Sequence, residues 1–397
     1  MNRPNKITRR HVLKTTVGLT AAAAGHPFIS PFCRASDAPA LPVAIGKCAA
    51  YDKQVMETLQ LLLDAIGGIG ALVKGKSVCV KVNLTGDPRR GVAGIPANRT
   101  YHTHPDVLHA TCALLGKAGA KRITIVESLL FNRPKEEVFE WAGWDLSSLK
   151  SAADNVHFED TRNKGTGSQY ATIHVPWGGY TYPAYEVNEI YAKSDVCVSI
   201  AKLKEHITAG VTLTMKNLFG VTPNSIYGSD AGSEDAHSAR EPLHTRRKKP
   251  ATDIQEIDPD CPRHGGYIVP RVTADLVGAR PIDIAIIDGI ECMQGGEGPW
   301  CRNVRPTKPG LLIVGKNPVC TDAVGMAIMG FDPTADRGTI PFKNCDNHLR
   351  LAAAVGLGSN DLSQIEIRGV PLKQALHPFD ASLRTEYPEQ LQKMFIR

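Results

Sequence analysis

The sequence predicts an α/β protein with a mostly parallel, doubly wound sheet, helices on both faces and a long polar insertion. Short apolar runs rich in β-branched residues alternate with segments whose apolar residues recur at helical spacing. This alternation is typical of parallel sheets, whose crossover connections are helices. Polar residues follow several runs directly, where ligand sites form in such folds. With 397 residues, 42% of them hydrophobic, the chain suffices for one large domain or for two lobes, 39–190 and 191–375.

Each expected element of the first half has its own local signal. Strands are expected at 43–45, 77–82, 122–126 and 171–175, and helices at 52–66, 103–117 and 135–142. Thr103 is the expected N-cap of the second helix, with Asp106 in its first turn. The rest of 145–185 has no clear period, and we expect it to be irregular.

The second half resumes the alternation after a central strand at 196–200. Further strands are expected at 282–287, 311–314 and 365–367, and helices at 212–220, 266–278 and 318–330. The insertion 222–266 is long and polar, which is typical of a lid or binding loop. The α/β domain is expected to span 39–375, with a C-terminal tail at 376–397.

The N-terminus predicts a twin-arginine signal peptide over residues 1–38. Arg9 and Arg10 precede a weakly hydrophobic stretch rich in Ala and Thr, followed by small residues. We therefore expect recognition by the twin-arginine translocase and a periplasmic or secreted protein. No apolar run of transmembrane length follows, so no stable membrane insertion is expected after signal removal.

The charge of the chain resides mostly in this signal. Residues 1–38 hold six Lys or Arg and one Asp, which is +5 of the total of +6, leaving about +1 for the remainder. The basic composition therefore gives no reason to expect a nucleic-acid partner. The cysteines form no C-x-x-C pair, so no ferredoxin-type cluster is indicated. Cys292 and Cys301 could pair in an oxidising compartment, and Cys261 with His264 has metal-like spacing.

The stretch 194–220 carries the strongest concentration of chemistry. Lys202, Lys204 and His206 follow the central strand at once, and Lys216 and Asn217 lie on the short helix after it. Such a cluster suits a carboxylate or phosphate, or allows a desolvated lysine to act as nucleophile or base. The alternative is a solvated basic loop after a buried strand.

Polar residues also end the neighbouring strands. Lys81 and Asn83 follow one strand, Glu127 ends the next, and Asp288 ends a strand of the second half. Because parallel strands place their carboxyl ends at one edge of a sheet, we expect these side chains to converge on one site. Each has a simpler explanation, such as turn formation by Asp288 with Gly289.

Several motifs together resemble a known family. They are KVNL at 81–84, HPDV at 104–107, AKLKEH at 201–206, VTLTMKNLFG at 211–220, DGI at 288–290, GEGP at 296–299, 317–323 and VGLG at 355–358. They resemble the domain of unknown function 362 family over most of residues 40–370. Members of that family often carry ferredoxin-like iron–sulfur modules, whose cysteines this sequence lacks.

The spacing of His206 and Lys216, ten residues apart, is also similar to that in nickel-pincer lactate racemases. That resemblance implies a cofactor held by Lys216, with Asn217 beside it, and a metal-binding histidine for which His237 and His244 are the candidates. The usual Gly-Gly before the lysine is absent here.

These observations lead to two hypotheses of different kinds. The first is an exported enzyme acting on a small anionic organic substrate, racemase- or epimerase-like, with His206 and Lys216 catalytic. The residues expected to bind its substrate are Lys202, Lys204, Asn83, His104, Glu127 and Asp288. The second is a periplasmic anion- or metal-binding or assembly protein without catalysis. A redox protein is a third possibility. The sequence does not identify the cofactor, which would be a metal or a group linked to lysine.

Overall fold

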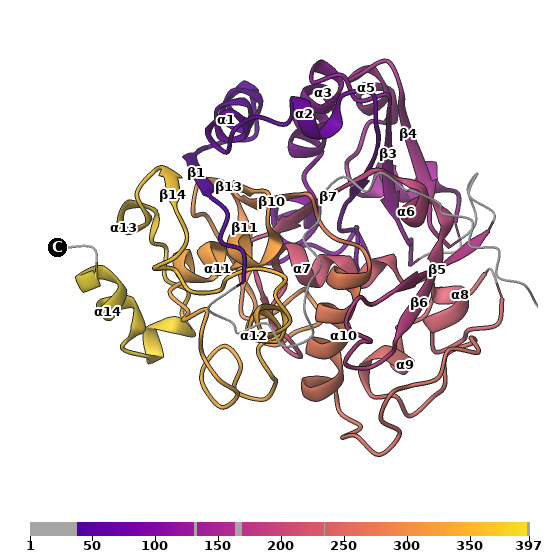
Figure 1. The fold of residues 1–397 in the computed structure, drawn as a ribbon. Helices are drawn as coiled ribbons and strands as arrows, with labels where there is room; N and C mark the ends of the chain where they lie inside the picture. Colours follow the sequence, from indigo (N-terminus) through magenta and orange to yellow (C-terminus); the bar gives the residue numbers. More distant parts are fainter. Residues whose placement is uncertain (1–37, 131–132, 163–168, 234, 395–397) are drawn as a thin grey trace, which may run out of the picture.

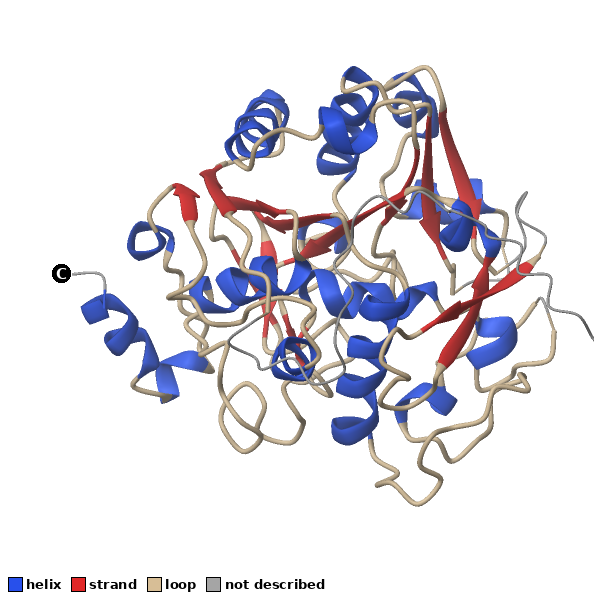
Figure 2. Ribbon diagram, in the orientation of Figure 1, coloured by secondary structure: helices blue, strands red, loops and turns tan. Residues whose placement is uncertain are grey.

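A central eight-stranded sheet organises the protein (Figures 1 and 2). The computed structural model describes residues 38–130, 133–162, 169–233 and 235–394, so the expected signal peptide lies outside them except for Ala38. The strands are β1 (Val43–Lys47), β2 (Ser77–Lys81), β3 (Arg122–Glu127), β4 (Val156–Asp160), β7 (Val196–Lys202), β10 (Ile284–Gly289), β13 (Leu311–Gly315) and β14 (Ile367–Gly369). Their order is β14-β1-β13-β10-β7-β2-β3-β4.

The predicted mostly parallel, doubly wound sheet is confirmed. Only β13 runs antiparallel to both of its neighbours, β1 and β10, while every other adjacent pair in the sheet is parallel. Strands from both halves of the chain alternate with helices and join this one sheet. The carboxyl ends of β2, β3, β7 and β10 consequently meet at the same edge.

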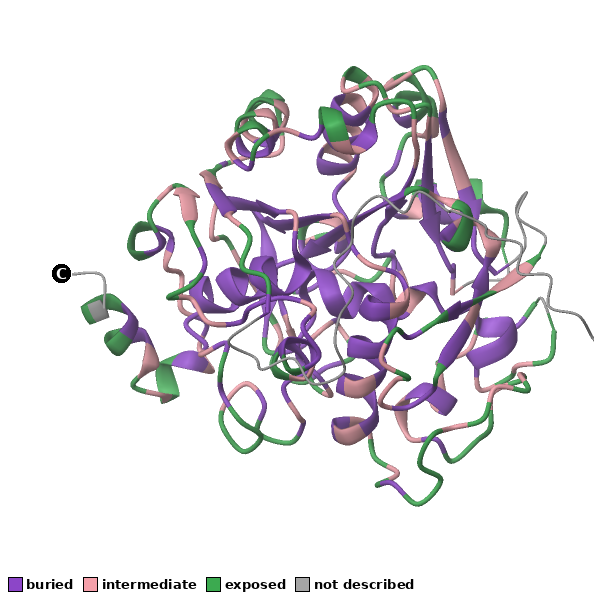
Figure 3. Ribbon diagram, viewed as in Figure 1, coloured by how far each residue is buried: buried purple, intermediate pink, exposed green. Residues whose placement is uncertain are grey.

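Helices cover both faces of the sheet. One face carries α1 (Lys53–Ala65), α2 (Gly70–Val73), α3 (Pro105–Lys117), α4 (Lys135–Trp141) and α5 (Leu146–Ser151), which pack on Val78, Val80, Val198 and Ile200. The other face carries α7 (Leu213–Asn217), α10 (Gly265–Ala279), α11 (Pro318–Ile328) and α12 (His348–Ala354), which pack around Cys79 and Cys197. Figure 3 shows the sheet and α11 buried, with the exposed residues mainly in outer helices and loops. Each sheet face is thus apolar, as a doubly wound fold requires.

The remaining elements are short and mostly peripheral. Three small antiparallel pairs are β5 (Tyr170–His174) with β6 (Ala184–Asn188), β8 (Glu205–His206) with β9 (Gly210–Val211), and β11 (Cys292–Gln294) with β12 (Arg305–Thr307). The short helices are α6 (Glu189–Lys193), α8 (Asn224–Tyr227), α9 (Glu241–His244), α13 (Leu372–Ala375), α14 (Tyr387–Met394) and the 3-10 turns Ala97–Arg99, Leu218–Val221 and Ser382–Arg384.

Two sequence-based expectations about local structure are wrong. The N-cap of α3 is His104, whose Nδ1 accepts from the Asp106 amide, whereas the Thr103 hydroxyl accepts from the Asn83 amide at 2.8 Å. Thr103 thereby ties the end of β2 to the start of α3. The stretch 145–185 is also more regular than expected, since β4 is an edge strand of the main sheet. The strand expected at 171–175 is present as β5, which forms a hairpin with β6.

No helix within the described ranges has both the length and the apolar character needed to cross a membrane. All nine cysteines of those ranges are free thiols, including Cys292 and Cys301. The segment 222–266 is not wholly exposed: the four residues of α8 are buried, and Leu243 of α9 is fully buried.

Candidate functional site

Two lysine–carboxylate pairs connect the ends of neighbouring parallel strands. Lys81 of β2 pairs with Glu127 of β3 at 2.9 Å, and Lys202 of β7 pairs with Asp288 of β10 at 2.8 Å. Successive side chains of a strand point to alternate faces of the sheet. Lys81 is paired with Ser199 of β7 and shares its face, and Ser199 lies three residues before Lys202. The two lysines therefore point to opposite faces.

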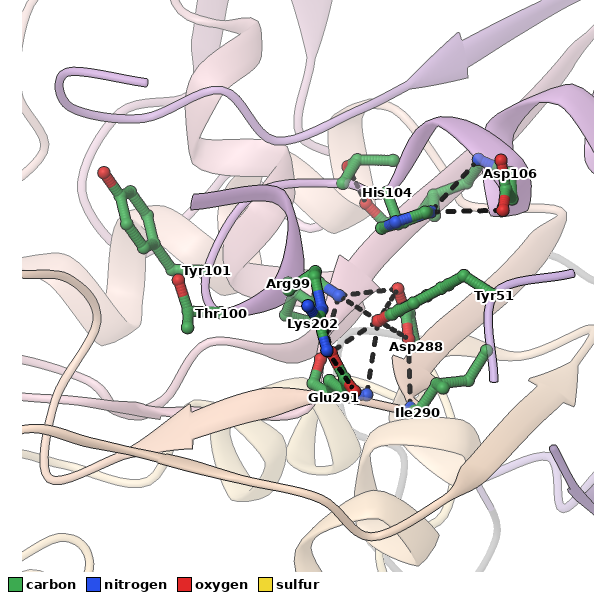
Figure 4. A network of polar contacts seen from close by, with 12 residues as sticks. Tyr51, Arg99, Thr100, Tyr101, His104, Asp106, Lys202, Asp288, Ile290 and Glu291 are labelled. Carbon is green, nitrogen blue, oxygen red and sulfur yellow. Dashed lines mark hydrogen bonds and ion pairs between the residues drawn. The ribbon is translucent and has the colours of Figure 1, made fainter. Parts of the chain in front are cut away.

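The pair on the α1 face belongs to a saturated polar network (Figure 4). Lys202 Nζ donates to the Tyr51 hydroxyl at 2.6 Å, to Asp288 Oδ2 at 2.8 Å and to the Glu291 carbonyl at 2.9 Å. The His104 ring stacks on Tyr51 with ring centroids 3.5 Å apart. Since an ammonium has three protons, Lys202 has none left for a ligand. The structure thus gathers Lys202, Asp288 and His104 together, away from the cavity described next.

The opposite face holds a cavity of about 380 Å³ at the ends of β2, β3 and β7. Seven of the residues expected at the site line it, namely Asn83, Glu127, Lys204, His206, Lys216, Asn217 and His244. Lys81, which was also expected at this edge of the sheet, lines the cavity as well, and the structure adds others, among them Arg240, Glu297, Phe219 and Trp300. Its size lies at the small end of the range for ligand pockets, which suits a small molecule.

Helix α7 is held firmly beside this cavity. The Asp322 carboxylate accepts from the backbone amides of Thr214 and Met215, both at 2.9 Å, and so caps the N-terminus of α7 from α11. The Asn217 side-chain amide donates to Ser199 Oγ and to the Ile200 carbonyl, and its oxygen accepts from Asn83. These bonds fix α7 to β7, and with it the position of Lys216.

Lys216 is a buried lysine whose amine has no hydrogen-bond acceptor among the described residues. The residue is 8% exposed, and its Nζ lies 3.8 Å from the centroid of the Phe219 ring. Burial lowers the pKa of Lys216 to about 7, and the Arg240 and Lys204 charges act in the same direction. A large share of this amine is therefore uncharged, and nucleophilic, at neutral pH.

Lys204 is the second perturbed lysine of the cavity. Its Nζ donates to the carbonyls of Tyr101 at 3.0 Å and of Glu297 at 3.1 Å. Burial lowers its pKa to about 7, opposed by the Glu297 carboxylate and assisted by Lys202. Strand alternation does not govern Lys204, because it lies beyond the end of β7 in the turn before β8.

The two cavity histidines are neutral and complementary. His206 Nδ1 accepts from the Thr208 amide at 3.2 Å, so its proton is on Nε2. His244 Nδ1 lies 2.7 Å from the Arg240 carbonyl, to which it must donate, so its Nε2 is an acceptor. Burial and the Lys216 charge lower the pKa of His244 to about 4 and that of His206 well below its ordinary value. The cavity thus has one imidazole donor and one imidazole acceptor.

Glu297 ties the glycine-rich loop to the turn that follows β7. One carboxylate oxygen accepts from the Ile207 amide at 2.9 Å and the other from the Trp300 indole at 3.2 Å. Burial alone would raise the pKa of Glu297, but the hydrogen bonds from the Ile207 amide and the Trp300 indole stabilise the carboxylate and lower that pKa. The Glu297 carboxylate therefore holds the glycine-rich loop beside the cavity, which Glu297 and Trp300 both line.

The chain matches the family described as "Domain of unknown function (DUF362)" over residues 78–327, more than half of its length. It belongs to this family. A thylakoid-associated protein of Synechocystis sp. is 26% identical over 360 residues, covering 89% of this chain and 95% of that protein. A solved structure of a Thermotoga maritima protein is 14% identical and covers 66% of this chain and 56% of its own, with a TM-score of 0.34.

The part of the DUF362 domain that the structure describes shows no metal-type donor cluster. In the described ranges, no three His, Cys, Asp or Glu side chains come together as a metal site would need. His237 is exposed, with Nδ1 3.1 Å from the Asp235 carbonyl, and it does not line the cavity, whereas His244 does. Cys261 contacts Arg246 Nη1 through its sulfur. The two candidate metal histidines therefore do not meet at one place.

Sequence reasoning missed several cavity residues of this DUF362 protein. Glu297 lies in the GEGP motif, which could have singled it out as the carboxylate of a glycine-rich loop. The sequence around Arg240 and Trp300 does not indicate that they lie at the cavity, because only the packing of 222–266 and of the loop after β11 brings them there.

Proposed function

We propose that this DUF362 protein is an enzyme that binds a small organic anion in the cavity beside Lys216 and transfers protons through that lysine, with the neighbouring histidines as hydrogen-bond partners. The observation that carries the proposal is the Lys216 amine, which is nine-tenths buried, faces a ligand-sized cavity and finds no acceptor among the described residues. Structural lysines, such as Lys202, have their donors satisfied.

The charge of the cavity lining supports an anionic ligand. Four cationic side chains, Lys81, Lys204, Lys216 and Arg240, stand against two carboxylates, Glu127 and Glu297. When all six side chains are ionised, the cavity lining carries a net charge of +2. Arg240 also has a buried Nη2 without an acceptor in the described part of the chain. A carboxylate or phosphate would supply the missing charge and acceptors.

Each lining residue then has a role that follows from its chemistry. Lys204 and Arg240 would hold the anion, and the neutral Lys216 amine would act as base or nucleophile. His206, with its proton on Nε2 and a lowered pKa, is better suited to donate a hydrogen bond than to accept a proton at neutral pH. His244 offers an acceptor nitrogen. Asn83 and Asn217 would position the helix that bears Lys216.

A non-catalytic anion-binding protein is the second candidate, favoured by the lowered pKa of both histidines, which makes them weak bases. The test is titration calorimetry of purified protein with a panel of small carboxylates and inorganic phosphate, followed by product analysis of each mixture. Lys216→Met should weaken binding and abolish any conversion, and Lys249→Met, an exposed control, should do neither. Binding without conversion of any ligand would favour the carrier, and equal binding by Lys216→Met would refute the proposed site.

Export by the twin-arginine route completes the proposal. It rests on Arg9 and Arg10 and on the apolar and small residues that follow them. A protein that folds before export could acquire a ligand or a cofactor in the cytoplasm. The absence of a long apolar helix in the described ranges is consistent with a protein not held in the membrane by that part of the chain.

A further inference from the structure

The surroundings of the Lys216 amine favour covalent chemistry over simple ion pairing. A lysine that only attracts anions works best when fully charged, yet the amine lies against the Phe219 ring and shares the cavity with three other cations. The three cations disfavour its protonation while they attract anions. An uncharged amine beside a carboxylate-binding group is the arrangement that condenses with a carbonyl compound.

We propose that the cavity accepts an oxo acid with an apolar substituent and that Lys216 forms an imine with its carbonyl carbon. This inference rests on the proposed function, because it names the class of anion that the site would take. It also gives Lys216 a specific task, that of nucleophile.

The step balances without an oxidant or a reductant. The Lys216 Nζ lone pair attacks the carbonyl carbon, and the C=O π electrons move to oxygen. One N–H proton passes to that oxygen to give a carbinolamine. The hydroxyl group then leaves with a second proton as water, and the C=N bond forms. The Nε2–H of His206 is the hydrogen-bond donor available to the departing oxygen, and Lys204 and Arg240 would hold the carboxylate.

An apolar wall at the cavity suggests the nature of the substituent. Trp300 lines the cavity together with Phe219, and Trp300 is 44% exposed. The indole is firmly held, since a Cβ added to either Gly86 or Gly298 would lie 2.3 Å from its ring, and Glu297 accepts its N–H. A fixed, exposed aromatic surface beside a polar cavity is suited to stacking an aromatic group.

The experiment is reductive trapping. The purified protein is incubated with phenylpyruvate and sodium cyanoborohydride, and adducts are detected by intact mass and peptide mapping. The expected result is one adduct, on the peptide that contains Lys216, which is heavier than the bare peptide by the mass of the oxo acid less one oxygen atom. Phenyllactate, which lacks the carbonyl group, should bind and give no adduct. Protein reduced before any ligand is added shows whether a resident carbonyl cofactor already occupies Lys216, which would also support imine formation there.

Three variants test whether the adduct is specific to Lys216 and to an aromatic substituent. Lys216→Met should lose the adduct, while Lys249→Met should keep it. Trp300→Ala should weaken trapping of phenylpyruvate about threefold to tenfold and leave trapping of pyruvate unchanged, since pyruvate has no aromatic group to stack. Mapping of the wild-type protein does not depend on how well any variant folds.

Failure of the imine inference and failure of the proposed anion site would give different results. If phenylpyruvate and phenyllactate bind equally well and no adduct forms on Lys216, the anion site stands and the imine inference is overturned. If neither compound nor any other small anion binds, the proposed function fails as well. Adducts spread over surface lysines, with none concentrated on Lys216, would also overturn the inference.

Discussion

Replacing Lys216 by Met should stabilise the protein, and the gain should depend on pH. Methionine has nearly the same length as lysine, so the substitution removes the charge with little change in packing. Burial lowers the pKa of Lys216 from its ordinary value of 10.5 to about 7. At about 1.4 kcal/mol per pKa unit, this shift corresponds to an upper limit of about 5 kcal/mol for holding the charged amine in the cavity. Because the amine faces a cavity that water enters, we expect a gain of about 1–3 kcal/mol.

The direction of the pH dependence follows from proton binding. Between about pH 7 and pH 10.5 the unfolded chain binds a proton at Lys216 that the folded protein lacks, so wild-type stability from this group rises with pH. Below about pH 7 the Lys216 amine is charged in the folded protein as well, and the destabilisation caused by burying this charge is at its maximum. The advantage of Lys216→Met should therefore be largest near pH 6 and should disappear toward pH 10.5.

Urea unfolding of wild type and Lys216→Met at about pH 6, 8 and 10 measures this difference directly. Lys249→Met, a change at an exposed position, serves as the matched control and should alter stability by no more than about 0.5 kcal/mol. If the difference between Lys216→Met and wild type is the same at all three pH values, the amine is not perturbed by its burial and the reasoning about the cavity is wrong.

Three further predictions concern other parts of the chain. Lys202→Met should destabilise the protein by about 3–5 kcal/mol in urea unfolding, because Asp288 would remain buried without its ion pair; a loss below about 1 kcal/mol would contradict the network. Replacing Arg9 and Arg10 together by Lys should leave precursor in the cytoplasm, which fractionation of expressing cells detects, and mature protein outside the cytoplasm would refute the signal. Limited proteolysis should cut first within 222–266, and a bound anion should slow that cleavage; early cuts elsewhere with this segment intact would argue against a lid.

The sheet and most of its elements were predictable because their signals are local. Buried parallel strands such as β7 read as short apolar runs, and the period of apolar residues in α1 and α10 gives their extent within a few residues. Strand β4 was missed because only two of its five residues, Val156 and Phe158, are apolar, which gives no clear strand pattern. The N-cap of α3 was misplaced by one residue because Thr103 is needed by Asn83.

The site was only partly predictable because proximity in sequence does not determine the face of a sheet. Lys202 and Lys204 are two residues apart, yet Lys202 ends the strand and points to the α1 face, while Lys204 lies in the turn and reaches the cavity lining. Arg240 and Trp300 reach the cavity from distant loops, and no local pattern gives their positions. The lowered pKa of His206 likewise depends on burial that only the folded protein provides.

The most direct test of the central claim is the titration of the Lys216 amine itself. Competitive labelling with limiting acetic anhydride across a range of pH, read by peptide mass spectrometry, reports the fraction of each lysine that is uncharged. The account predicts that the Lys216 peptide labels with a midpoint near pH 7 and that a bound carboxylate protects it. A midpoint at the ordinary lysine value of about 10.4, unaffected by any anion, would contradict the account.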